Sequence, residues 1–66
     1  MLKVGDAVKA LSDHKEEGIG RGDVGTVAFC FTEPSEGYEV EFLDEDGCTK
    51  AVLTLEPGDY EPVQMV

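Results

Sequence analysis

Hydrophobic and polar side chains alternate along most of this chain, and Gly, Pro and Asp interrupt the alternation at short intervals. Alternation with a period of two places apolar side chains on one face of a β-strand. The clearest case is GYEVEFLD, residues 37–44, in which apolar side chains alternate with Glu39 and Glu41. The stretch KALSDHKEEG, residues 9–18, is the one candidate helix, and it has no apolar stripe at helical spacing. The pattern therefore predicts an all-β protein.

Five segments have the pattern of short strands. They are residues 4–11, 25–32, 37–44, 48–56 and 60–66. Within them, alternation predicts apolar faces made by Val4, Val8 and Ala10, by Val27, Phe29 and Phe31, by Tyr38, Val40 and Phe42, and by Thr49, Ala51, Leu53 and Leu55. We expect most of the five aromatic residues to be needed for the core, since a chain of 66 residues has few large side chains to bury.

Turn residues separate these segments. EPSEG at 33–37 and DEDG at 44–47 are typical of hairpin turns, and EPGDY at 56–60 predicts a single 3₁₀-like turn before the last strand. The longest loop, 12–22, joins the first two strands. Together these features predict one domain over residues 1–66, a small five-stranded SH3-like antiparallel barrel.

The stretch GRGDVGTV, residues 20–27, has the Gly-x-Gly-x-x-Gly spacing of dinucleotide-binding proteins. That fingerprint requires a helix after the glycines, whereas the residues after Gly25 are β-branched and aromatic. We therefore interpret Gly22, Asp23 and Gly25 as turn residues where the long loop enters the second strand, with Gly47 in the same role in a hairpin. No cofactor is expected.

The order of these motifs resembles a known class. A Gly-Asp-x-Val strand, a loop and a Gly-x-x-Gly-x-Val strand are similar to the KOW-type and related SH3-like barrels. The elements at 22–27, 40–42, 44–47 and 49–55 more closely resemble an uncharacterised bacterial family of short stand-alone domains. This resemblance implies the fold and assigns no activity. KOW domains often bind RNA through basic loops, but this chain has no Lys or Arg between Arg21 and Lys50, so that function is not carried over.

The chain is strongly acidic, with fifteen Asp and Glu against five Lys and Arg and a formal net charge of −10. This charge repels nucleic-acid phosphates and anionic membranes, so neither is expected as a partner. The partner that it attracts is a basic protein surface. The alternative, that acidity serves only solubility, stays open.

Seven acidic residues lie within fourteen positions that contain no basic residue. They are Glu33, Glu36, Glu39, Glu41, Asp44, Glu45 and Asp46. Like charges placed this closely cost stability, which suggests a use in docking on a basic partner. The acids at 44–46 do not match a calcium-binding loop, and no metal site is predicted.

The chain has few residues of the types that act as catalytic bases and nucleophiles. The single histidine, His14, and Cys30 could be imagined as a base and a nucleophile, but Cys30 falls within a strand. We expect Cys30 and Cys48 to be small packing residues, neither catalytic nor zinc-binding. The chain shows no signal peptide and no apolar stretch long enough to span a membrane, which predicts a cytoplasmic protein with reduced thiols.

The function expected from these features is a non-catalytic acidic module that docks on a basic protein, as an accessory subunit or as an inhibitor or immunity-type protein. A variant has the acids mimic nucleic acid and block a nucleic-acid-binding protein. A different class, an accessory domain of a metalloenzyme or redox complex, rests on fold analogy alone. The oligomeric state is left open.

Overall fold

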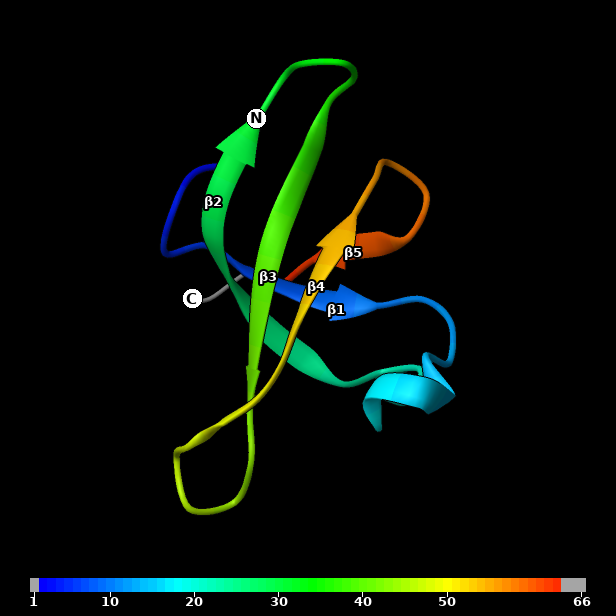
Figure 1. The fold of residues 1–66 in the computed structure, drawn as a ribbon, viewed down its shortest axis with the longest axis vertical. Helices are drawn as coiled ribbons and strands as arrows, with labels where there is room; N and C mark the ends of the chain where they lie inside the picture. The colour runs from blue at the N-terminus through cyan, green and yellow to red at the C-terminus, as the bar shows by residue number, and fades with distance from the viewer. Residues whose placement is uncertain (1, 64–66) are drawn as a thin grey trace.

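The computed structural model describes residues 2–63, which form five β-strands in one antiparallel sheet (Figure 1). The strands are β1 (Ala7–Ala10), β2 (Val24–Phe31), β3 (Gly37–Leu43), β4 (Thr49–Leu55) and β5 (Tyr60–Pro62). Their order across the sheet is β4-β3-β2-β1-β5. The prediction of an all-β fold with five antiparallel strands is confirmed. The end of the last predicted strand, 64–66, lies outside the described residues.

The sheet bends about β2. This strand pairs with β1 through residues 24–26 and with β3 through residues 26–31. Its register shifts between Val27 and Phe29, which marks a β-bulge at Ala28, and a bulge bends its strand and increases the local twist. β1 and β5 consequently cross behind β3 and β4 at a steep angle (Figure 1). The result is a small barrel-like domain with its core between the two layers.

The core takes residues from four strands and from the first loop. Its buried members are Val8, Ala10, Ile19, Val27, Tyr38, Val40, Phe42, Leu53 and Leu55. All the buried side chains of β3 and β4 belong to the apolar faces that alternation predicts. Ile19 belongs to the core but to none of the predicted strand faces: it is 2% exposed although it lies in the first loop.

The bulge in β2 overturns one predicted face. Cys30, after the bulge, lies opposite Tyr38 and packs against the core, whereas Phe29 lies opposite Glu39 and is 56% exposed. The prediction that Val27, Phe29 and Phe31 share one inward face is therefore wrong, because the extra residue inverts the alternation after Val27. The aromatic rings of Phe29 and Phe31 stack on each other outside the core, with centroids 6.3 Å apart.

Three smaller expectations at strand ends are also wrong. Val4 precedes β1 and is 64% exposed, so it does not share the buried face of Val8. Thr49 is exposed because the β3–β4 register shifts between Phe42 and Leu43, next to the turn. Cys48 precedes β4 and is exposed, so it is not a packing residue.

The first loop is folded around a short 3₁₀ helix, η1 (Lys15–Glu17). The backbone groups of His14 and Ile19 exchange hydrogen bonds of 2.7 and 3.1 Å, which close the loop and hold Ile19 against the core. The turn predicted before β5 is closed by a hydrogen bond of 2.9 Å from the Asp59 N–H to the Glu56 carbonyl. The φ of +101° at Gly58 makes it a type II turn, which also favours Pro57 at the preceding position.

The glycines of GRGDVGTV have two different roles. Gly22 has a φ of +95° in a turn closed by a hydrogen bond from the Asp23 N–H to the Gly20 carbonyl. Asp23 also accepts a hydrogen bond of 2.9 Å from the Gly20 N–H through its carboxylate. Gly25 lies within β2, where a Cβ would come within 2.6 Å of Val40 and 2.8 Å of the Glu41 carbonyl oxygen. Gly25 therefore lets β2 and β3 approach closely.

Candidate docking surface

The face of β2, β3 and β4 that is turned away from the core, here called the outer face, carries both carboxylates and exposed apolar side chains. Glu39 and Glu41 lie on it, two residues apart on β3, at a separation of about 7 Å along the strand. Four hydrophobic side chains on these strands are more than half exposed: Val24 at 53%, Phe29 at 56%, Leu43 at 54% and Val52 at 53%. The outer face therefore combines negative charge with accessible apolar surface.

The pairing register shows which side chains frame the two acids. Glu39 lies between Phe29 on β2 and Thr54 on β4. Glu41 lies one row further along, between Thr26 on β2 and Val52 on β4. Directly opposed side chains of an antiparallel sheet are close enough to touch. Each carboxylate therefore stands between small or apolar neighbours.

No basic side chain neutralises these carboxylates within residues 2–63. The described residues contain a single ion pair, Lys9–Glu61 at 3.3 Å, and it joins the exposed faces of β1 and β5. Glu41 accepts a hydrogen bond from the Thr49 hydroxyl, which orients the carboxylate without cancelling its charge. The negative potential over the middle of β3 is therefore available to a partner.

Phe29 and Phe31 form an aromatic pair beside this face, and Phe31 packs closely on β3. Phe31 pairs with Gly37, and a Cβ at Gly37 would lie 2.7 Å from the Phe31 ring. Gly37 thus leaves room for the ring to lie over the start of β3, and Phe29 stacks beside it. This aromatic pair could not be found by alternation because the bulge that exposes it has no distinct sequence signal.

The other predicted acids lie away from Glu39 and Glu41. Glu33 and Glu36 belong to the β2–β3 loop and the acids at 44–46 to the β3–β4 turn, and these connections lie at opposite ends of the long hairpin (Figure 1). The eight residue steps from Glu36 to Asp44 span roughly 27 Å in an extended strand. The seven predicted acids therefore form a line along the hairpin and not one cluster.

Glu36 belongs to a tyrosine cluster at the loop end of the hairpin. Its carboxylate accepts a hydrogen bond of 3.3 Å from the Tyr38 hydroxyl, and the rings of Tyr38 and Tyr60 meet edge to face at 5.5 Å. Burial raises the pKa of Tyr38, and the charge of Glu36 raises it further. The pKa of Tyr60 is raised by the same two causes in the same order. Glu36 therefore connects the loop to β3, and Tyr38 in turn connects β3 to β5.

Asp44 organises the β3–β4 turn. Its Oδ1 accepts hydrogen bonds from the N–H groups of Asp46, at 2.9 Å, and Cys48, at 3.0 Å. The turn places Gly47 at a φ of +84°, a conformation that glycine adopts without strain. Glu45 and Asp46 are exposed at the tip. Asp44 is thus the residue whose carboxylate organises this turn.

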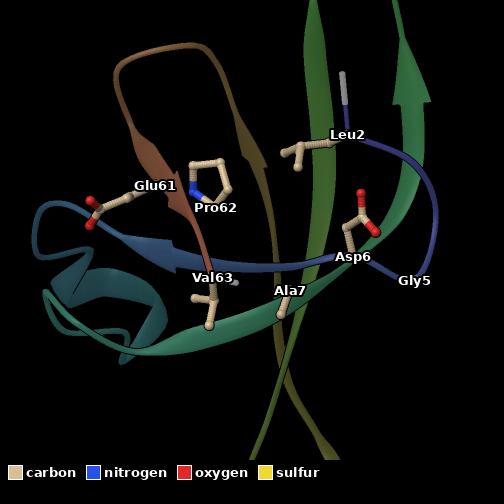
Figure 2. Close-up of a pocket in the computed structure, with 7 residues that line it drawn as sticks. All are labelled: Leu2, Gly5, Asp6, Ala7, Glu61, Pro62 and Val63. Carbon is tan, nitrogen blue, oxygen red and sulfur yellow. The ribbon is translucent and has the colours of Figure 1, made fainter. Parts of the chain in front are cut away.

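A second surface feature is a hollow of about 640 Å³ between the N-terminal turn and β5. Figure 2 shows Leu2, Pro62 and Ala7 around it, with the Asp6 carboxylate at one side and that of Glu61 directed away. The Asp6 carboxylate accepts a hydrogen bond from the Lys3 N–H, and the Glu61 carboxylate forms an ion pair with Lys9. The hollow therefore offers mainly apolar surface.

The residues considered for chemistry are not brought together. The Cys30 thiol donates to the Leu2 carbonyl at 3.8 Å, near the end of β2 remote from the loop that carries His14 (Figure 1). The His14 Nε2 is buried and has no hydrogen-bond partner among the described residues. Within residues 2–63, no three His, Cys, Asp or Glu side chains are grouped as metal ligands.

No helix within residues 2–63 has the length and hydrophobicity needed to cross a membrane.

These features define a small all-β, barrel-like domain with an acidic and apolar outer face. The chain belongs to a family described as a domain of unknown function (DUF4926), whose model matches residues 5–62 and so includes all five strands and the outer face. Neither the comparison with curated proteins nor that with solved structures found a match.

Proposed function

We propose that this domain is a non-catalytic binding module that docks on a basic protein surface through its outer face. The observation that carries the proposal is the pair Glu39 and Glu41, unpaired with any described cation and framed by exposed apolar side chains. Solubility alone is served by acids at any exposed position. It does not account for half-exposed Phe29 and Val52 beside the two carboxylates.

Lysine and arginine side chains suit such a surface. Their aliphatic stems pack on apolar surface while their charged ends reach carboxylates. Guanidinium groups also stack on aromatic rings, and Phe29 offers one beside Glu39. The net charge of −10 would speed association with a basic partner and make it sensitive to salt.

We further propose that the domain is an SH3-like, KOW-related barrel, and the single bent sheet of five antiparallel strands supports this proposal. Its two free cysteines, one of them exposed, are in keeping with a cytoplasmic location.

The test compares capture of proteins from an extract of the source cells by three forms of the domain. The first is the wild type and the second is Glu39→Lys/Glu41→Lys. The third, Glu16→Lys/Glu17→Lys, is the matched control: it changes the net charge equally but at η1, away from the outer face. We expect the wild type and the control to retain a stoichiometric basic partner, and the outer-face variant to lose it.

Raising the salt concentration should weaken the complex steadily. Equal capture by the outer-face variant, or binding that salt does not change, contradicts the proposal. Competition by DNA for the captured partner would identify the nucleic-acid-mimic form of the function. A metalloenzyme or redox protein as the partner would identify the accessory role.

A further inference from the structure

The sheet has two edge strands, and they differ in how they are protected. β5 is three residues long and ends in Pro62, and proline and short length both discourage further strand pairing. β4 is seven residues long and has no proline, and its final five residues pair regularly with β3. Within residues 2–63, no strand pairs with the other side of β4. β4 is therefore the edge able to accept a strand.

The hydrogen-bond pattern shows which groups of β4 face this open edge. The Val27 N–H donates to the Asp6 carbonyl at 2.8 Å, and the Val27 carbonyl accepts from Gly5 at 2.9 Å, so the backbone groups of Val27 point away from β3. Backbone direction alternates along a strand. Thr26 therefore points toward β3, where it pairs with Glu41.

The same alternation continues across β3. Because the backbone groups of Glu41 point toward β2, those of its neighbours point toward β4. Val52 lies opposite Glu41, and Thr54 lies opposite Glu39. Both are therefore non-hydrogen-bonded pairs, in which the backbone groups of the β4 residue point away from β3. Their N–H and C=O groups face the open edge, and both residues are exposed. β4 thus presents two donors and two acceptors at the spacing of an antiparallel or parallel ladder.

We propose that an extended basic segment of the partner adds to β4 as a sixth strand. The proposal rests on the proposed function and specifies how the partner binds. Charge selects the occupant: a second copy of this domain would bring another net charge of −10 to the edge, whereas a basic segment is attracted. Main-chain hydrogen bonds supply affinity in such strand addition, and alternate side chains supply specificity.

The register predicts an alternating partner sequence. Side chains of the added strand on the outer face would lie beside Val52 and Thr54 and about 10 Å from β3, two strand spacings away. Lysine or arginine at these positions can extend over the small Val52 and Thr54 side chains toward Glu41 and Glu39. Side chains on the other face would meet the edge of the core at Leu53, which favours apolar residues there.

The experiment titrates the whole domain with a synthetic peptide of alternating Lys and Val, matched in length to β4. The measurement is amide hydrogen exchange by NMR. We expect the Val52 and Thr54 amides to become protected at saturation. Two control peptides, one with Glu in place of Lys and one with the same Lys and Val residues in separate blocks, should give no protection.

Thr54→Pro removes one outward N–H without removing a hydrogen bond to β3, as proline is tolerated on edge strands. We expect it to weaken peptide binding about tenfold. Thr54→Val keeps the N–H and should bind as the wild type does. The amide spectrum of each variant shows whether the sheet is intact, and Val52→Pro serves as the second proline variant.

Peptide binding without protection of Val52 and Thr54, or self-association of the domain through β4, would overturn the proposal. So would equal affinity for the alternating and block peptides. These results are separate from a failure of the proposed function. Glu39→Lys/Glu41→Lys should lower the peptide affinity yet leave the Val52 and Thr54 amides protected at saturation. Docking on the outer face is tested separately, by whether this variant still captures the basic partner.

Discussion

At the scale of single residues, Gly25 and Gly22 show how two glycines in one motif meet different physical demands. Gly22 has a positive φ and open space around its Cα. Gly25 does not have a positive φ, but three atoms of β3 occupy the place of a side chain. The sequence predicts a turn leading into a strand here, yet it does not distinguish the two demands, since both select glycine.

We expect Gly25→Val to unfold the domain. The new side chain would collide with Val40 and with the Glu41 carbonyl, and overpacking costs about 1–3 kcal/mol or more where backbone must move. That loss is a large part of the stability of so small a domain. Urea unfolding followed by circular dichroism measures it. Gly22→Ala is the control, with a loss of about 1–2 kcal/mol from backbone strain alone. Equal stability of Gly25→Val and the wild type would contradict the packing described for Gly25.

At the scale of strands, alternation predicts β3 from Tyr38 to Phe42 and β2 only as far as its bulge. Tyr38, Val40 and Phe42 are buried, as the pattern predicts, whereas apolar Leu43 is exposed after the register shift. In β2 the bulge at Ala28 inverts the pattern, and it moves Phe29 and Phe31 off the inward face and brings Cys30 to the core. A bulge depends on the pairing of two strands and on the bend of the sheet, which one strand's sequence does not encode locally.

The two phenylalanines Phe29 and Phe42 test this inversion with the same chemical change. Phe42 is 1% exposed, so Phe42→Ala should cost about 3–5 kcal/mol and unfold most of the protein. Phe29→Ala should change the free energy of unfolding by no more than about 0.5 kcal/mol, as expected for a surface substitution. Thermal unfolding of both variants provides the measurement. A loss at Phe29 equal to that at Phe42 would place Phe29 in the core.

The contact between β3 and β5 predicts a loss of stability at alkaline pH. Burial, then the charge of Glu36, raises the pKa of Tyr38 and Tyr60 above the ordinary 10.0. The folded state therefore holds these protons more tightly than the unfolded state. Their contribution to stability is complete below pH 10 and is lost as the pH rises through the folded-state pKa values.

Urea unfolding midpoints measured at increasing pH should thus fall above about pH 10, in step with tyrosinate absorbance. Tyr38→Phe should make the fall shallower, since it removes one of the two groups. An unfolding midpoint that stays constant while both tyrosines ionise would show that the cluster does not carry this linkage.

At the scale of the whole molecule, the sequence predicts the sign of the charge but not its arrangement. Seven acids close in sequence become a line along one hairpin, with Glu36 and Asp44 holding local structure and Glu39 and Glu41, which pair with no described cation, at its middle. The sequence indicates Glu39 and Glu41 as outward neighbours. It could not indicate the exposed apolar side chains beside them, because Phe29 is exposed by the bulge. Nor could it indicate the open edge at β4, which follows from the order of the strands.

Docking on the outer face is tested most sharply by the footprint of the captured basic partner on the domain, measured as changes in amide NMR signals. Docking through the outer face predicts changes concentrated on β2, β3 and β4, around Glu39, Glu41 and Val52, with little change around η1 or the hollow beside β5. A footprint centred on the hollow lined by Leu2 and Pro62, with the Glu39 and Glu41 signals unchanged, would contradict it.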